Sequence, residues 1–212
     1  MNVRYRVVLL VVMMLSNLGL GFSAASPDTS TAEKTILPAP HAERYTKISY
    51  LFDNGDLPTN KEDAEKYIEE ISVPIWVYNT TTQTMQSSTK MLKVHKKLKE
   101  DVLAIFTEIH NHTPKFPIAS DSYGYSFRGN SADFSKLSHH SYGTAIDINP
   151  SDNPQVNSEG TILRPPGGRK YDPENNLYSI PSWVVTIFNN HGWTWGETYP
   201  TKDYMHFSYL GG

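Results

Sequence analysis

Apolar residues recur at helical spacing in two stretches of this chain. Between residues 94 and 111 they lie three or four positions apart, at Val94, Leu98, Val102, Ile105, Phe106 and Ile109. A shorter stretch follows Ser182 and stops at Gly192, and its expected buried side chains are Trp183, Val184, Ile187 and Phe188. Such spacing puts the apolar side chains on one face of a helix. The pattern therefore predicts two principal helices, the second capped by Ser182 and ended by Gly192.

Shorter elements precede the first of these helices. Asn60 is followed by acidic residues, which is typical of a helix N-terminus and predicts a short helix through Glu70. Residues 71–78 predict a strand. Pro74 cannot donate a ladder hydrogen bond, so it confines this strand to a sheet edge or places Pro74 near the start of the strand.

Two further strands carry polar residues inside an apolar alternation. Within residues 144–148, Asp147 alternates with isoleucines and so faces away from them. Residues 204–208 have the same period of two, which separates His206 from its apolar neighbours. If these strands are adjacent in one sheet, Asp147 and His206 point to the same place.

A histidine pair upstream of Asp147 completes a set of metal ligands. His139 and His140 precede Asp147, and His206 lies close to the end of the sequence. Two imidazoles and a carboxylate leave one position of a four-coordinate zinc ion open for water, whose pKa then falls to about 7. This donor set predicts hydrolytic chemistry. Spacing alone does not decide between His139 and His140.

The motifs around these residues resemble those of one enzyme family. Residues 138–147 read Ser-x-His-x-x-Gly-x-Ala-x-Asp, followed by Trp-Gly at 195–196 and Asp-x-x-His at 203–206. This pattern resembles the zinc D-alanyl-D-alanine carboxypeptidases and L-alanyl-D-glutamate endopeptidases, which cut the peptides of bacterial peptidoglycan. The resemblance covers about residues 70–209.

The resemblance implies a role for each matching residue. It implies that His140, rather than its neighbour, binds Zn²⁺ together with Asp147 and His206. It also implies that Asp203 is the general base and that Arg128 stabilises the oxyanion. A guanidinium suits that task because it stays protonated and offers forked donors.

Each of the two catalytic assignments has an alternative. Asp203 also fits a turn residue after Pro200, and Arg128 also fits a solvated surface cation. Where many relatives have Trp-Gly-Gly, this chain has Glu197 after Gly196. Glu197 is therefore a rival for the base or a solvent-facing residue.

The N-terminus has the pattern of an export signal. Arg4 and Arg6 precede an unbroken apolar run over residues 7–15, and residues 23–25 are small. We therefore expect a signal peptide at 1–25, a flexible linker at 26–45 and a zinc peptidase domain at 46–212, secreted or periplasmic. The nine-residue apolar run is shorter than the roughly 20 residues that span a bilayer, so no stable membrane anchor is expected.

Charge and composition narrow the possible partners. Of the 19 basic residues, Arg4 and Arg6 lie in the leader, so the rest of the chain has 17 Lys and Arg against 22 Asp and Glu, a net charge of −5. This balance argues against a nucleic-acid partner. The chain has no cysteine, but the remaining length suffices for one hydrophobic core without disulfides. We expect a monomer that acts on peptidoglycan stem peptides.

The expected fold is α+β, with the principal helices on one side of a small, mostly antiparallel sheet and a zinc cleft on the other. The long segment 149–179 follows the strand of Asp147 and carries Arg164, Arg169 and Lys170, which predicts a substrate-binding rim. The predicted function is an exported zinc metallopeptidase, either a D-Ala-D-Ala carboxypeptidase or an L-Ala-D-Glu endopeptidase. The alternative is a non-catalytic zinc domain that binds cell-wall peptide.

Overall fold

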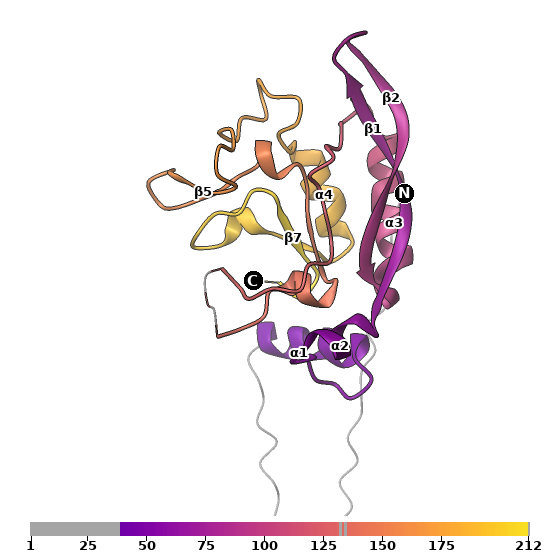
Figure 1. The fold of residues 1–212 in the computed structure, drawn as a ribbon, viewed down its shortest axis with the longest axis vertical. Coiled ribbons are helices and arrows are strands. Elements are labelled where there is room, and N and C mark those ends of the chain that lie inside the picture. The colour runs from indigo at the N-terminus through magenta and orange to yellow at the C-terminus, as the bar shows by residue number, and fades with distance from the viewer. Residues whose placement is uncertain (1–38, 132, 134, 212) are drawn as a thin grey trace, which may run out of the picture. The chain divides into compact units, whose positions relative to one another are not determined.

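The computed structural model describes residues 39–131, 133 and 135–211, so the predicted signal peptide and linker residues 26–38 lie outside the described residues. The helices are α1 (Ala39–Leu51), α2 (Lys61–Glu65), α3 (Lys99–Asn111) and α4 (Ser182–Asn190) (Figure 1). Short 3₁₀ helices are η1 (Lys96–Leu98), η2 (His139–Tyr142), η3 (Pro150–Asp152) and η4 (Gly196–Thr198). The strands are β1 (Ile68–Asn79), β2 (Thr84–His95), β3 (Ala145–Asp147), β4 (Gln155–Val156), β5 (Ile162–Arg164), β6 (Thr194–Trp195) and β7 (His206–Ser208).

The described strands form three small antiparallel sheets, and the predicted α+β class is confirmed. Strands β1 and β2 make a long hairpin, β4 and β5 a short one, and β3, β7 and β6 a three-stranded sheet in that order. In the three-stranded sheet Asp147 lies directly opposite His206. The two strands predicted from alternating polarity are therefore neighbours.

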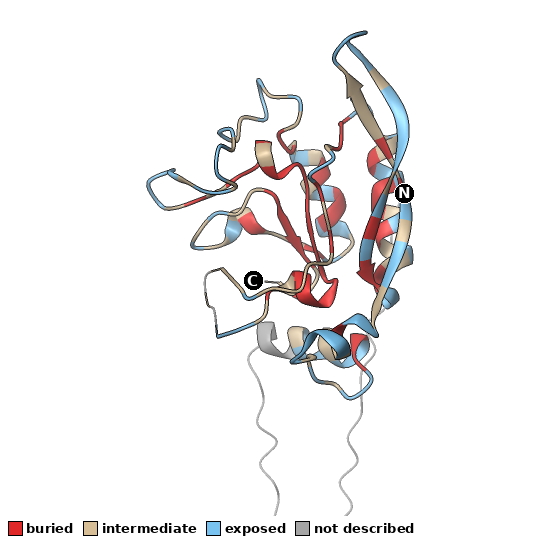
Figure 2. Cartoon of the chain, in the orientation of Figure 1, coloured by how far each residue is buried: buried red, intermediate tan, exposed pale blue. Residues whose placement is uncertain are grey.

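Helices α3 and α4 pack against the strands and form much of the hydrophobic core with them, α3 against β1 and α4 against β6 and β7. Helix α3 packs against β1 through Val102, Ile105, Phe106 and Ile109, all buried. On α4, Phe188 stacks on Phe207 of β7 with ring centroids 3.9 Å apart. Figure 2 shows that burial is concentrated on the central strands and on the helix sides that face them. Because neighbours on a strand point to opposite faces, His206 faces away from α4.

The first principal helix begins later than its apolar spacing predicts. Val94 and His95 end strand β2, where they pair with Glu69 and Ile68, and the α-helix begins at Lys99 after the turn η1. Val94 and Leu98 are buried all the same. The apolar spacing marked burial correctly, but a strand end and a 3₁₀ turn provide that burial in place of a helical turn.

The predicted short helix also ends early, at Glu65 rather than Glu70, and β1 begins at Ile68. Its predicted cap is confirmed, because the Asn60 side chain accepts a hydrogen bond from the backbone N–H of Asp63 at 2.9 Å. Residues 68–70, expected to be helical, are thus part of the strand, since cross-strand pairing with β2 outweighs the weak helical preference there.

The ends of α4 differ from the prediction at one terminus only. Pro181 is the N-cap, and Ser182 is the first helical residue with no side-chain capping bond, so the predicted Ser182 cap is wrong. Gly192 has a φ of +77°, the left-handed conformation that ends a helix, as predicted. Trp183 is half-buried and stacks on His112 at 3.8 Å.

Helix α1 takes up residues 39–45 of the segment predicted as linker. Polar contacts attach it: Lys47 Nζ donates to the carbonyl of Gly192 at 2.9 Å, and Arg44 Nη2 donates to His139 Nε2 at 3.1 Å. Such contacts leave no apolar period in the sequence, which explains why pattern analysis did not find the helix. Within the described part of the chain, no helix combines the length and the apolar character needed to cross a bilayer.

His191, the residue after α4, links α4 to α3 through contacts with two carboxylates. His191 Nδ1 lies 2.5 Å from Asp101 Oδ1, and His191 Nε2 lies 2.9 Å from Glu108 Oε1. Burial disfavours the charged imidazole, but the hydrogen bonds to the two carboxylates outweigh it and raise the pKa of His191 above its ordinary value. Asp101 also accepts from Trp193 Nε1 at 2.9 Å.

This contact predicts a pH-dependent contribution to stability. Because the folded pKa of His191 is raised, the stabilisation is fully present below about pH 6.5 and is lost as pH rises through the folded pKa. In wild type the free energy of unfolding should therefore decline as pH rises through the folded pKa of His191. In His191→Gln we expect this contribution to the decline to be absent. Urea unfolding of both proteins between pH 5 and pH 9 measures it, and parallel curves would contradict the assignment.

Candidate metal centre

Three side chains from two strands and one 3₁₀ helix converge on a single point. Asp147 ends β3, His206 begins β7 opposite it, and His140 lies in η2 just before β3. His140 Nε2 is 3.1 Å from Asp147 Oδ1 and 3.1 Å from His206 Nδ1, and His206 Nδ1 is 3.0 Å from Asp147 Oδ1. The three atoms form a nearly equilateral triangle.

Hydrogen bonds determine which atoms of this triangle carry lone pairs. His140 Nδ1 lies 2.6 Å from the carbonyl of Gly124, and a carbonyl can only accept, so Nδ1 carries the proton and Nε2 presents its lone pair. His140 and Asp147 are buried, and His206 is 9% exposed. Burial opposes ionisation of Asp147, but His140 and His206 outweigh it and hold the pKa of the carboxyl well below its usual range. The site therefore contains an anionic oxygen beside imidazole nitrogens.

This arrangement fits a zinc ion. In a tetrahedral site with metal–ligand distances near 2.0–2.1 Å, neighbouring ligand atoms lie about 3.3 Å apart, close to the sides of this triangle. Two nitrogens and one carboxylate oxygen are also the donors that catalytic zinc sites use. In the described part of the chain, no other group of three His, Asp or Glu side chains converges in this way.

The neighbouring histidine is turned away from the cluster. His139 Nε2 lies 3.1 Å from Arg44 Nη2, which can only donate, so Nε2 accepts and Nδ1 donates to Ser208 Oγ at 2.7 Å. Burial, together with the charges of His206, Arg44 and His140, lowers the pKa of His139 to about 3. Both ring nitrogens are used in holding α1 and β7 together. Geometry thus places His140 in the triangle and excludes His139 from it.

Asp203 lies beside the triangle with one carboxylate oxygen unpaired. Its Oδ1 is buried and finds no hydrogen-bond partner among the described residues. Its backbone N–H donates to Gly196 at 2.9 Å, and its carbonyl accepts from the N–H of His206 at 3.1 Å. A Cβ on Gly196 would lie 2.5 Å from the Asp203 carbonyl oxygen, so this close approach requires glycine.

Burial and the neighbouring carboxylate of Asp147 favour the protonated form of Asp203. Burial, followed by the charge of Asp147, raises the pKa of Asp203 to about 7, while His206, Arg128 and Arg164 act in the opposite direction. A carboxyl with such a pKa can take up and release a proton near neutral pH. Asp203 also begins a turn, because its carbonyl accepts from the N–H of His206, so the turn role and a role as base are compatible.

Arg128, whose charge also acts on Asp203, has a backbone that is fixed by hydrogen bonds. Its N–H donates to Ser141 Oγ at 2.9 Å, and the same hydroxyl donates to the carbonyl of Arg128 at 2.8 Å. Its Nη2 donates to the hydroxyl of Tyr123 at 3.3 Å. Arg128 is therefore a positioned side chain rather than a free surface cation.

Tyr123 is a site residue that pattern analysis missed. Its ring stacks on His140 with centroids 4.9 Å apart, and its hydroxyl lies between Arg128 and Asp147. Burial raises the pKa of Tyr123 first, and the carboxylate of Asp147 raises it further. The tyrosine-rich sequence before Arg128 was the available signal, but nothing in it distinguishes this tyrosine from Tyr125.

Glu197, the rival base, is engaged elsewhere. Lys202 Nζ lies 2.5 Å from Glu197 Oε1, and the Glu197 side chain is about one-third exposed. The ion pair draws this carboxylate to the surface of the 200–202 turn. The geometry favours the solvent-facing alternative for Glu197.

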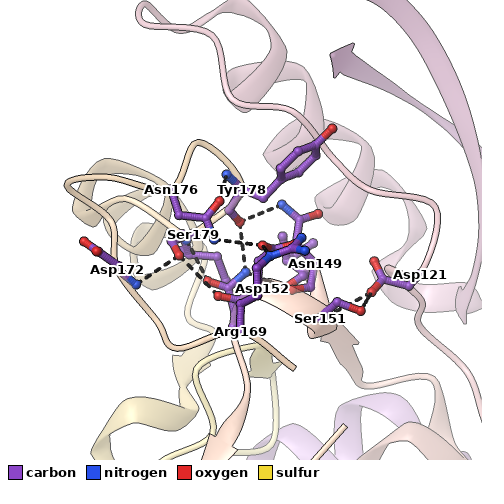
Figure 3. Close-up of polar contacts among 12 residues, drawn as sticks. Asp121, Asn149, Ser151, Asp152, Arg169, Asp172, Asn176, Tyr178 and Ser179 are labelled. Atoms are coloured by element: carbon purple, nitrogen blue, oxygen red, sulfur yellow. Dashed lines mark hydrogen bonds and ion pairs between the residues drawn. The ribbon is translucent and has the colours of Figure 1, made fainter. Parts of the chain in front are cut away.

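Polar contacts hold the segment 149–179 in place (Figure 3). The buried carboxylate of Asp152 accepts from Arg169 Nε and Nη2 at 2.5 and 2.8 Å and from Asn176 Nδ2 at 2.8 Å. Asp121 likewise accepts from the hydroxyl of Ser151 at 2.7 Å. Arg169, one of the cations of the predicted rim, therefore serves to anchor the segment.

Residues 132–209 match the D-alanyl-D-alanine carboxypeptidase family. The predicted resemblance is confirmed over this range, which we call the carboxypeptidase segment. It contains His140, Asp147, Asp203 and His206, whereas Arg128 lies just before it. Comparison with curated proteins and with solved structures gave no match.

A hollow of about 360 Å³ lies at the outer edge of the carboxypeptidase segment. It is bounded by α1, the end of α4 and the strand β6, including Glu43, Lys47 and Thr194. None of the candidate ligands or catalytic residues lines it. We therefore do not assign the chemistry of the site to this hollow.

Metal analysis of single variants tests the choice of histidine in the carboxypeptidase segment. We expect about one zinc per wild-type chain, its loss in His140→Ala, and its retention in His139→Ala, because only His140 presents a lone pair to the triangle. Elemental analysis after dialysis against zinc-free buffer gives the stoichiometry. Retention of zinc in His140→Ala with loss in His139→Ala would reverse the assignment.

Proposed function

We propose that this protein is an exported zinc peptidase that hydrolyses peptide bonds in bacterial peptidoglycan. The observation that carries the proposal is the triangle of His140, Asp147 and His206 with the unpaired oxygen of Asp203 beside it. The family match supports hydrolysis of a peptide as the reaction class. The signal peptide predicted at residues 1–25 supports a secreted or periplasmic location, where peptidoglycan lies.

His140, Asp147 and His206 would hold the metal. When bound there, zinc supplies Lewis acidity toward a carbonyl oxygen and makes a water molecule acidic enough to attack at neutral pH. Tyr123 keeps the ring of His140 in place by stacking, and Gly124 keeps its tautomer fixed. These contacts preorganise the ligand side chains before any substrate arrives.

Asp203 would handle the proton. In hydrolysis a water oxygen bonds to the carbonyl carbon, the carbon–nitrogen bond breaks, and the leaving amine must gain a proton. Asp203 Oδ1 takes the proton from the attacking water and later delivers it to that amine. The raised pKa supports this double role, because a carboxylate with an ordinary pKa near 4 is a much weaker base.

Arg128 would stabilise the negative charge that develops on the carbonyl oxygen. Its guanidinium stays protonated, and its contacts with Tyr123 and Ser141 hold it without pairing it to a carboxylate. The fork of N–H donors is therefore left for the reacting group.

We favour the D-Ala-D-Ala carboxypeptidase over the L-Ala-D-Glu endopeptidase, because the family that matches residues 132–209 is that of D-alanyl-D-alanine carboxypeptidases. We also propose that the protein acts as a monomer.

Replacement of the base separates proton transfer from metal binding. We expect Asp203→Asn to keep its zinc and to lose about 10² to 10⁴ in kcat, since the amide cannot accept the proton. Glu197→Gln is the matched control and should retain activity, because Glu197 pairs with Lys202. An active Asp203→Asn beside an inactive, zinc-loaded Glu197→Gln would assign the base to Glu197.

Arg128→Ala distinguishes transition-state stabilisation from substrate anchoring. We expect kcat to fall by about 10² or more with little change in KM, because the interaction strengthens only as charge develops on the oxygen. Steady-state kinetics on a stem pentapeptide measures both constants. A raised KM with an unchanged kcat would show that Arg128 anchors a carboxylate instead.

The function as a whole is tested by digestion of purified muropeptides. We expect mass spectrometry to detect the loss of one terminal D-alanine from pentapeptide stems, and cleavage after L-alanine would indicate the endopeptidase instead. If the zinc-loaded protein binds muropeptides and releases no product, the non-catalytic alternative replaces the proposal.

A further inference from the structure

The hairpin β4–β5 lies directly against the segment that carries the proposed base. Gln155 of β4 forms an antiparallel bridge with Asp203. The N–H of Val156 donates to the carbonyl of Lys202 at 2.8 Å, next to that bridge. Within the hairpin, Gln155 is also the cross-strand partner of Arg164. Asp203, Gln155 and Arg164 are therefore successive neighbours across three adjacent backbone segments.

This pairing determines the side on which Arg164 lies. Residues directly opposite one another in antiparallel pairs project from the same face. Arg164 thus projects from the face from which Asp203 projects. Neighbouring segments lie about 4.8 Å apart, so the backbone at Arg164 is about 10 Å from the backbone at Asp203. Arg164 is also one of the three charges that lower the pKa of Asp203, which agrees with this placement.

Arg164 has no partner that would use its charge. It is exposed, and among the described residues no carboxylate or carbonyl pairs with it. By contrast, the guanidinium of Arg169 pairs with the carboxylate of Asp152, and that of Arg128 donates to the neutral hydroxyl of Tyr123. A free guanidinium with forked donors is the side chain best suited to a carboxylate.

The position of Arg164 is supported by the anchored segment around it. Just beyond β5, the N–H of Arg169 donates to the carbonyl of Ser151 at 2.7 Å, and Asp152 holds its guanidinium (Figure 3). At the other end, β4 is bonded to the segment of Asp203. One flank of the hairpin is thus fixed to η3 and the other to the segment of Asp203, and Arg164 is presented from a supported backbone.

We propose that Arg164 is a specificity-determining residue that binds a carboxylate of the substrate peptide, at a distance from the scissile bond set by the hairpin. This inference rests on the proposed function. A stem peptide with lysine at its third position offers two such groups, the terminal carboxylate of D-alanine and the free carboxylate of D-glutamate. Arg128, which contacts Tyr123 beside Asp147, would stabilise the reacting carbonyl oxygen. Arg164 would instead select the substrate.

Three synthetic stem pentapeptides test the proposal: the parent acid, its C-terminal amide, and a peptide with D-isoglutamine in place of D-glutamate. For Arg164→Gln we expect KM for the parent acid to rise about tenfold or more with kcat unchanged, as for loss of a charged hydrogen-bond pair. The effect should vanish with one of the two amidated peptides, which identifies the carboxylate. Arg164→Lys should recover part of the affinity.

Lys93→Gln is the matched control, because it removes one positive charge from an exposed position on β2, outside the predicted rim. It should leave KM unchanged. An equal loss on all three peptides in Arg164→Gln, or a loss of kcat alone, would overturn the proposal. Zinc content and melting temperature are compared across the variants, so that a folding defect is recognised.

Calorimetry with the same peptides separates this proposal from the proposed function. If wild-type protein releases no product, weaker binding of the parent acid to Arg164→Gln, with no change for one amidated peptide, still supports the role of Arg164 while the hydrolase fails. Equal binding of every peptide by wild type and Arg164→Gln overturns the role of Arg164 whether or not the protein is an enzyme. Absence of binding to wild type overturns both.

Discussion

The antiparallel pairing of β3 with β7 is the constraint on which the site depends. It puts Asp147 opposite His206 and at the same time buries Ile146 and Phe207 on the face covered by α4. A slip of one residue would exchange the two faces and would move the ligands into the core. The stacking of Phe188 on Phe207 therefore protects the geometry of the metal ligands, although neither ring touches them.

The second constraint is the use of two adjacent histidines for opposite purposes. His140 is fixed by Gly124 and presents a lone pair, whereas His139 is neutral and joins Arg44 of α1 to Ser208 of β7. The short η2 helix turns one ring toward the cluster and the other away from it. Gly143 then ends that helix in a left-handed conformation, where a Cβ would lie 2.5 Å from the backbone nitrogen of His95. The residue after η2 therefore has to be glycine, both because of its left-handed φ and because a side chain there would collide with the backbone of β2.

Sequence patterns predicted the parts of the site that depend on local periodicity. The alternation around Asp147 and His206 marked their faces correctly, and the apolar spacing identified α4 and most of α3. The strand β2 was missed because most of its side chains are exposed and polar, so its pairing with β1 leaves no alternation to detect. Helix α1 was missed because its contacts are with residues far along the chain: Arg44 and Lys47 make polar contacts there, and Leu51 is buried in the core. Tyr123 and Arg164 acquire their positions from tertiary pairing, which no local pattern contains.

The central claim is that three lone pairs converge on one zinc ion, and anomalous diffraction tests it most directly. Crystals of the zinc-loaded protein, measured on both sides of the zinc absorption edge, should give one strong peak about 2.0–2.2 Å from His140 Nε2, Asp147 Oδ1 and His206 Nδ1. Density for a fourth, non-protein ligand should complete the tetrahedron. A peak at His139, or no peak within coordination distance of the triangle in protein shown to contain zinc, would contradict the account.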